Sequence, residues 1–113
     1  DFQNLEVYKK AVIQHKDINN LLKQNSKIKR SLKDQLYRSS SSIVLNISEG
    51  SGKFSKADKR NFYYSARGSL YESVSILELL VVEDIFERQE LKHLLERYIE
   101  ISKMLLGLIR SQS

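Results

Sequence analysis

Residues 42–53 read SIVLNISEGSGK, and this stretch decides the fold because it ends one helix and opens the connection to the next. Ile43 and Ile47 recur in it at helical spacing. Gly50 and Gly52 follow, and glycine readily adopts the left-handed backbone conformation that ends many helices. A basic loop then begins at Lys53. The stretch predicts a helix that ends near residue 49, followed by a short, positively charged loop.

Apolar residues recur at helical spacing along the rest of the chain as well, and they predict four helices in all. The first follows a stripe of Leu5, Tyr8, Val12, His15 and Leu22, with Ala11 and Ile18 beside it, and ends at residues 24–26. The second covers residues 31–49, with Leu32, Leu36, Ile43 and Ile47. The third covers residues 56–82, with Phe62, Ala66, Ser69, Ser73, Ile76 and Leu80. The fourth covers residues 88–110, with Leu91, Leu94, Tyr98, Ile101, Leu105 and Leu108.

Serines that precede two of these segments are candidates for helix caps. Ser26 or Ser31 could cap the second helix, and Ser55 could cap the third. Asp58 stands three residues after Ser55, as in a capping box with a shortened acid. Each of these serines would satisfy a backbone N–H that the first turn of a helix leaves unpaired.

The composition agrees with an all-α fold. The chain has 113 residues, no proline, no cysteine and four glycines. A chain of this length forms one domain, residues 1–113. Four amphipathic helices with short connections predict an antiparallel up-down-up-down bundle. The absence of cysteine fits a cytoplasmic protein, and no apolar run is long enough to span a membrane, so no membrane partner is expected.

Positive charge is concentrated in the first half of the chain. The net charge is +5, and residues 1–60 carry 13 Lys and Arg against 6 Asp and Glu. Residues 61–113 carry 6 basic residues against 8 acidic ones. This asymmetry favours a basic face that meets phosphates or an acidic protein partner. A basic surface that serves only solubility is the alternative.

Two basic clusters are candidate nucleic-acid contacts. The first surrounds the predicted loop and comprises Lys53, Lys56, Lys59 and Arg60, with Tyr63 and Tyr64 directly after it. Cations beside aromatic rings suit phosphates and stacked bases. The second lies between the first two helices and comprises Lys27, Lys29, Arg30 and Lys33. An antiparallel bundle places the two clusters at opposite ends, although a ring of subunits could join either one into a basic rim.

Small and polar residues form a second stripe on the two middle helices. On the second helix they are Gln35, Ser39, Ser42, Asn46 and Glu49, and on the third Ser65, Ala66, Gly68, Ser69 and Ser73. Small side chains at this spacing predict close packing of the two helices, rather than a merely polar surface. Gly68 costs helix stability, so a close contact is expected there. Glu49 and Glu72 are expected to pair with Arg38 or Arg67, because partly buried charge needs a partner.

The fourth helix carries more apolar residues near its end than one core stripe requires. They are Ile99, Ile101, Met104, Leu105, Leu106, Leu108 and Ile109. A small bundle has room for only part of this surface in its core, so the excess favours an oligomer interface. A terminal helix that is buried more deeply than the others is the alternative.

Nothing in the sequence favours catalysis. His15 and His93 are the only histidines, and no Glu-x-x-His pair is present to build a metal site in a bundle. His15 lies on an apolar stripe and is expected to be a core residue, whereas His93 and its neighbour Arg97 are expected to be surface residues. No nucleophile elbow or phosphate-binding loop of the Walker type occurs. We therefore expect no catalytic, cofactor-binding or metal-binding residue, and a protein that is not an enzyme.

The combined motifs resemble those of the family of four-helix-bundle proteins encoded within intervening sequences of bacterial 23S rRNA genes. The resemblance runs over nearly the whole chain. The residues that carry it are Phe2-Gln3-Asn4-Leu5-Glu6-Val7-Tyr8-Lys9-Lys10-Ala11, Leu36-Tyr37-Arg38-Ser39, Asn46-Ile47-Ser48-Glu49-Gly50 and Ala66-Arg67-Gly68-Ser69-Leu70-Tyr71-Glu72. Ser48 replaces the family's usual Ala, and Lys53 replaces a common Arg, which keeps the charge but loses the bidentate fork.

This resemblance implies a left-handed four-helix bundle that assembles as a homo-oligomeric ring, a pentamer. The chain is also similar to the accessory variability determinant protein of diversity-generating retroelements, a basic ring that binds reverse transcriptase and nucleic acid. The sequence therefore leaves two candidate functions. The first is an oligomeric protein that binds structured RNA or DNA, and the second is a scaffold or accessory subunit for an acidic protein partner.

Overall fold

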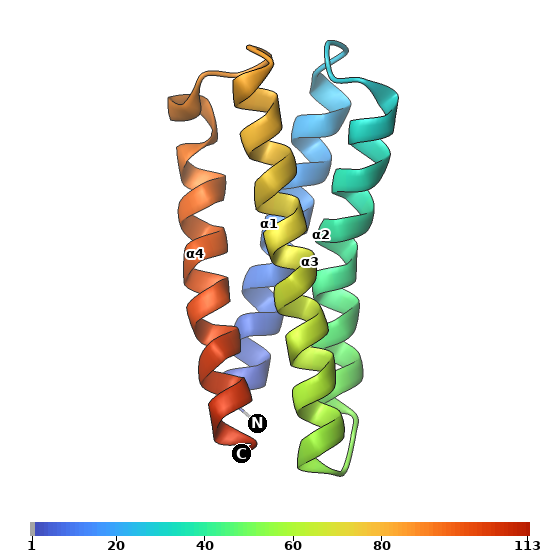
Figure 1. Cartoon of the computed structure of the whole chain (residues 1–113), viewed down its shortest axis with the longest axis vertical. Helices are drawn as coiled ribbons and strands as arrows, with labels where there is room; N and C mark the ends of the chain where they lie inside the picture. The colour runs from blue at the N-terminus through green and yellow to red at the C-terminus, as the bar shows by residue number, and fades with distance from the viewer. Residues whose placement is uncertain (1) are drawn as a thin grey trace.

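Four long helices make up this computed structural model, which describes the backbone of residues 2–113 and side chains from Asn4 onward. They are α1 (Phe2–Gln24), α2 (Arg30–Ser51), α3 (Lys56–Val82) and α4 (Arg88–Ser111). Figure 1 shows them running alternately up and down, with both chain termini and the α2–α3 loop at one end of the bundle. The principal dimensions are 44 × 23 × 19 Å. The predicted all-α four-helix bundle is therefore correct.

Each helix packs against two neighbours: α1 and α3 both lie between α2 and α4. The core between them is formed by buried Leu, Ile, Val and Ala side chains and by two fully buried tyrosines, Tyr63 and Tyr98. All six residues predicted for the core stripe of α4 are buried. Within the described part of the chain, no helix combines the length and the hydrophobicity that crossing a membrane requires. Phe2 and Gln3, which open the first motif, have side chains outside the described residues.

Helix α1 turns a different face to the core from the one predicted. Val7, Ala11, Ile18 and Leu22 are buried, together with Gln14. Leu5, Tyr8 and Val12 remain 48%, 38% and 40% exposed, so the predicted stripe was wrong at these positions. Both sets have helical spacing, and the core accepts Gln14 because its Nε2 donates to the Leu94 carbonyl at 2.7 Å. The face of α1 that packs on the core includes polar residues, so hydrophobic periodicity did not identify it as the core face.

The connection between α2 and α3 differs from the prediction in its glycines. Helix α2 continues through Gly50, which is buried, and ends at Ser51; its C-cap residue Gly52 has a φ of −86°, an ordinary right-handed value. Gly50 is needed for space: a Cβ there would lie 2.7 Å from Cε1 of Tyr63 and 3.1 Å from Cβ of Phe62. Gly50 therefore lets α2 and α3 approach closely. The prediction that a glycine in the left-handed conformation ends the helix is wrong.

The helix caps agree with the prediction in one case of two. Ser55 caps α3, and its Oγ accepts a hydrogen bond from the Asp58 N–H at 3.1 Å. Helix α2 instead begins after Lys29 without any side-chain cap, so neither Ser26 nor Ser31 has the predicted role. Helix α4 has a full capping box in which the side chains of Glu87 and Glu90 bond reciprocally to the backbone.

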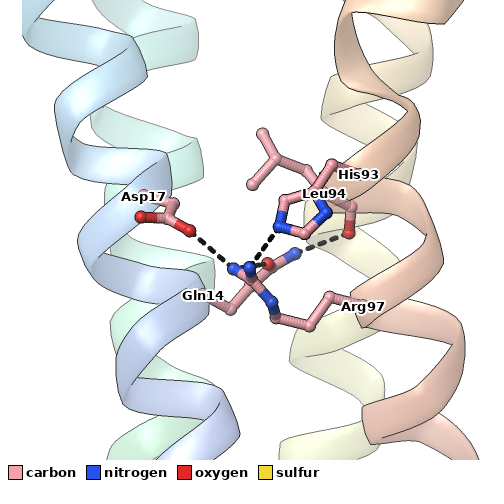
Figure 2. A network of polar contacts seen from close by, with 5 residues as sticks. All are labelled: Gln14, Asp17, His93, Leu94 and Arg97. Carbon is pink, nitrogen blue, oxygen red and sulfur yellow. Dashed lines mark hydrogen bonds and ion pairs between the residues drawn. The ribbon is translucent and has the colours of Figure 1, made fainter.

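A polar network joins α1 to α4, as Figure 2 shows. Nη1 of Arg97 donates to Asp17 Oδ2 at 2.7 Å and to Gln14 Oε1 at 3.0 Å. Nη2 of Arg97 meets Nε2 of His93. The Arg97 side chain is only 16% exposed, so the sequence-based expectation that it is an ordinary surface charge was wrong. Asp17, one turn beyond Gln14 on α1, gives the guanidinium its counter-ion and makes partial burial tolerable.

Candidate nucleic-acid interface

The α2–α3 loop, residues 52–55, presents an aromatic ring to solvent. Phe54 is fully exposed and lies between Lys53 and the cap residue Ser55. Exposed phenylalanine at a loop tip is unusual because it leaves the whole apolar ring in water. The sequence analysis missed Phe54, although an aromatic residue inside a basic loop with no helical partner was the signal for it.

The four cations predicted around this loop do lie at the same end of the bundle. Lys56 is exposed in the first turn of α3. Lys59 Nζ donates to the Ser51 carbonyl at 3.3 Å, and Arg60 donates to the Gln112 carbonyl at the end of α4. Carbonyl partners orient these cations without neutralising them. Among the described residues, neither Lys59 nor Arg60 has an acidic partner, so both keep their positive charge.

Among the described residues, Lys53 alone of these four has an acidic contact. Its Nζ lies 3.9 Å from Glu49 Oε2, one helical turn back, and 5.2 Å from the centre of the Phe62 ring. An exposed ion pair at that distance contributes little. Lys53 is therefore available to a phosphate that approaches the loop. We name Lys53, Phe54, Lys56, Lys59 and Arg60 the loop cluster.

Tyr63 lies in the core and cannot stack on a base. Its ring is fully buried, its hydroxyl donates to Asn4 Oδ1 at 3.0 Å, and burial raises its pKa. The prediction that Tyr63 contacts nucleic acid is therefore corrected. Tyr64, one position further along α3, is 55% exposed. The helical turn places only one of two adjacent tyrosines on the surface.

The second basic cluster lies at the other end of the bundle, as predicted. Lys27, Lys29, Arg30 and Lys33 line a cleft at the α1–α2 turn, together with Ser26, Ile28 and Asp34. Among the described residues, none of these four cations forms an ion pair. The α3–α4 turn reaches the same end (Figure 1), and it carries the exposed acids Glu83, Asp84 and Glu87. This end is therefore basic on one side and acidic on the other.

The predicted close packing of α2 on α3 is present. Oγ of Ser39 lies 2.7 Å from Oγ of Ser73, and Oγ of Ser42 lies 2.9 Å from Oγ of Ser69. Asn46 Nδ2 donates to the Ser42 carbonyl at 2.9 Å. These pairs satisfy the hydroxyls between the helices, so the seam can be polar without leaving groups unpaired.

Other expectations for this seam were wrong. A Cβ at Gly68 would meet nothing within 4 Å, so this glycine makes no close contact. Arg67 lies over the Tyr71 ring at 5.1 Å rather than beside a glutamate. Arg38 and Glu72 form no ion pair within the described part of the chain. Both instead line an open groove along α2 and α3, with Gln35, Ser41, Ser42, Leu45, Asn46, Glu49 and Ser69.

The histidines and acids of the described residues form no group of three or more that could hold a metal ion. His15 is half-buried, and its Nδ1 lies 2.5 Å from Ser40 Oγ. Burial lowers the pKa of His15. The ring edge meets Tyr37 at 5.0 Å. These contacts explain His15 as part of the α1–α2 packing.

Comparisons with known proteins agree on one family. A family model described as the 23S rRNA-intervening sequence protein matches residues 3–107. A crystal structure from Bacteroides thetaiotaomicron, described as a protein with unknown function from the S23 ribosomal protein family, superposes with a TM-score of 0.89. It is 28% identical to this chain, and the alignment covers 96% of this chain and 98% of that one. No protein with a curated description matches significantly.

Proposed function

The chain belongs to the 23S rRNA-intervening sequence protein family, and from this membership and the geometry of the α2–α3 loop we propose that it is a non-enzymatic, cytoplasmic protein that binds structured RNA. The observation that carries the proposal is Phe54, which is fully exposed among the cations of the loop cluster. Base stacking on an exposed ring contributes about 1–3 kcal/mol, and neighbouring cations bind phosphates. We place the RNA contact at the loop cluster, with an unpaired base on Phe54.

The proposed RNA-binding protein acts as a homo-oligomer, with the pentameric ring as its expected form. In a ring of parallel bundles, all α2–α3 loops lie on one rim. The loop clusters of neighbouring copies then form a continuous basic surface, which increases affinity for a long RNA by multivalency. A single copy offers one ring and a few cations, which is a small contact for a structured RNA.

Fluorescence anisotropy with a labelled RNA hairpin that has an unpaired loop tests the proposal. Phe54→Ala should weaken binding by roughly tenfold, because it removes one stacking platform. Val82→Ala is the matched control, since Val82 is 74% exposed and lies at the opposite end of the bundle. Equal affinity of the Phe54→Ala variant and the wild type would exclude stacking at this loop.

Salt titration tests the phosphate contacts separately. The logarithm of the binding constant should fall linearly with the logarithm of the salt concentration. Lys56→Gln with Lys59→Gln should reduce that slope by about two, if each lysine contacts one phosphate. Binding that ignores ionic strength would contradict the proposed role of the loop cluster.

A protein-binding function is the second candidate, and the groove along α2 and α3 favours it. Arg38 and Glu72 line that groove, and neither forms an ion pair with any described residue, so a partner could supply the complementary charges. The partner would be an acidic protein or a nucleic-acid enzyme such as a reverse transcriptase. Capture of one stoichiometric protein that survives nuclease treatment and is lost with Arg38→Glu would favour this function over RNA binding.

A further inference from the structure

The cleft at the α1–α2 turn is positively charged, and the RNA contact proposed at the loop cluster does not use it. Four cations line this cleft: Lys27, Lys29, Arg30 and Lys33. The ion pairs found among the described residues all involve other cations. Like charges around one cleft repel one another, so a ligand that neutralises several of them at once is favoured. We call this cleft the turn cleft.

The turn cleft has a single acid among the described residues that line it. This acid is Asp34, which lies one helical turn after Arg30 on α2 and forms no ion pair with any described residue. Four cations therefore face one carboxylate. The excess of positive charge favours an anion that carries several negative charges, because a single negative charge would leave most of these cations without a partner.

The backbone that carries the first two cations is held in place by the core. Ile28 lies between Lys27 and Lys29 and is only 3% exposed, so it anchors the turn beneath them. At the end of α1, Asn25 Nδ2 donates to the Leu21 carbonyl at 2.8 Å. A turn that is fixed before the ligand arrives reduces the entropy that binding must overcome.

The lining of the turn cleft suits phosphates and does not suit bases. Lysines bind phosphate as point charges, and Arg30 can offer its guanidinium as a two-pronged donor. None of the residues that line the cleft is aromatic, in contrast to the loop cluster with its exposed Phe54. The volume of about 730 Å³ lies within the range of small-molecule sites. The cleft therefore matches a compact ligand that is recognised by its phosphates.

The acidic side of the same end disfavours a long polyanion. The α3–α4 turn carries the exposed acids Glu83, Asp84 and Glu87 (Figure 1). An RNA strand laid across this end would pass these carboxylates as well as the four cations, and like charges side by side oppose binding. A compact anion can stay within the turn cleft and avoid them.

We propose that the turn cleft binds a free, compact polyphosphate, such as the triphosphate group of a nucleotide, through Lys27, Lys29, Arg30 and Lys33. The nucleoside part stays in solvent, because the cleft offers it no stacking surface. The inference depends neither on the RNA contact at the loop cluster nor on assembly. Where the acidic turn of a neighbouring copy reaches the turn cleft, it competes with the ligand for the same cations.

Isothermal titration calorimetry with inorganic triphosphate, without divalent cations, tests the turn cleft. Triphosphate should bind roughly tenfold more tightly than orthophosphate, because it engages more of the four cations. Lys27→Gln with Lys29→Gln should weaken triphosphate binding by roughly tenfold or more. Lys9→Gln with Lys92→Gln is the matched control, because both lysines are exposed, lie outside the cleft and remove the same charge. All four positions are exposed, so circular dichroism should show folded helices in both variants.

Two further probes test which form of the ligand the turn cleft accepts. Adenosine triphosphate should bind about as tightly as inorganic triphosphate, since its nucleoside makes no contact. Clearly tighter binding of adenosine triphosphate would contradict recognition by phosphates alone. A hairpin RNA with a 5′-triphosphate that displaced inorganic triphosphate at lower concentration than adenosine triphosphate would overturn the assignment to a free ligand.

Failure of this inference is distinguishable from failure of the RNA-binding proposal. Equal loss of triphosphate binding in the control variant would show that net charge, not the turn cleft, holds the ligand, and would overturn the inference. Absence of triphosphate binding by the wild type would do the same and leave the RNA contact at Phe54 to its own test. Conversely, a protein that ignores RNA but binds triphosphate through Lys27 and Lys29 would keep the turn cleft and lose the RNA-binding proposal.

Discussion

At Gly50, helix α2 passes so close to α3 that an added Cβ would lie 2.7 Å from the ring of Tyr63. That ring cannot move aside cheaply, because it is fully buried and its hydroxyl is bonded to Asn4. Gly50→Ala should therefore lower the free energy of unfolding by about 1–3 kcal/mol, the usual range for overpacking a core. Urea denaturation followed by circular dichroism measures the change.

Gly68→Ala is the matched substitution at a glycine with open space around it. Alanine favours the helical conformation over glycine by about 1 kcal/mol, and nothing lies within 4 Å of the new Cβ. The variant should unfold at a higher urea concentration than the wild type. The same sign of change at both glycines would contradict the assignment of Gly50 as the point of close approach.

The Tyr98 hydroxyl is buried, and no group among the described residues forms a hydrogen bond of normal geometry with it. Burial raises the pKa of Tyr98 from its ordinary value near 10 to about 12, and it outweighs the polar side chains of Ser73 and Gln14, which favour the charged form and oppose the shift. The unfolded chain loses this proton first as the pH rises above 10. The folded state is therefore stabilised fully below pH 10 and loses that contribution between pH 10 and about 12.

Tyr98→Phe isolates this effect, because phenylalanine has no proton to lose. The wild type should lose stability relative to the variant at up to about 1.4 kcal/mol per pH unit above pH 10. Near neutral pH the variant should be as stable as the wild type or slightly more stable, since the hydroxyl has no partner to leave behind. If the two proteins lost stability equally as the pH rose to 12, the raised pKa of Tyr98 would be refuted.

Among the elements, α2, α3 and α4 behave largely as their sequences predict, and α1 does not. Helix α4 buries all six residues of its predicted stripe, because its other faces are clearly polar over most of their length. Helix α1 has two candidate stripes. The core uses the one that contains Gln14, and the more apolar stripe of Leu5, Tyr8 and Val12 stays at the surface. Hydrophobic periodicity cannot tell a core stripe from an exposed stripe when both are apolar.

The same limit applies to the candidate site. The sequence located the basic loop and its cations, because charge and glycine are visible in a single chain. It offered Tyr63 and Tyr64 alike as stacking rings, since a choice between them needs the rotation of α3 about its axis. It missed Phe54 because exposure depends on the path of the loop. Local composition therefore predicts which segment is a candidate site, and the fold decides which of its side chains reach the surface.

The contact between α1 and α4 depends on Arg97. It joins Asp17 and Gln14 of α1 from a partly buried position (Figure 2). Arg97→Ala should lower the free energy of unfolding by about 1–3 kcal/mol, because it leaves Gln14 Oε1 without a donor in a buried site. Lys10→Ala is the control, since its ion pair with Glu100 is exposed and should contribute much less. Thermal unfolding measures both, and equal losses would count against the network.

At the scale of the whole molecule, the two ends of the bundle differ in charge pattern. The loop end carries the cations of the loop cluster, and the other end separates a basic turn from an acidic one. In the proposed homo-oligomer, this separation would keep a net charge of +5 from repelling neighbouring copies. Opposite charges would then meet between copies at one end, while the cations of the loop cluster at the other end would stay available to a phosphate backbone.

Charge reversal at the acidic α3–α4 turn tests whether opposite charges meet between neighbouring copies. Glu83→Lys with Glu87→Lys makes both turns of that end basic, so neighbouring copies should repel there. Self-association should weaken by roughly tenfold at low salt, and the loss should shrink as salt screens the charges. Asp58→Lys with Glu72→Lys is the control, because it changes the net charge by the same amount but lies outside both turns. Sedimentation equilibrium measures the association constants.

A second charge reversal, at the basic α1–α2 turn of the same chain, distinguishes pairing between the two turns from a general effect of net charge. Lys27→Glu with Lys29→Glu, added to the variant with the reversed acidic turn, exchanges the signs of the two turns and restores the wild-type net charge. If the turns pair head to tail, this fourfold variant should recover most of the lost association. If it stays dissociated, the two turns do not face each other.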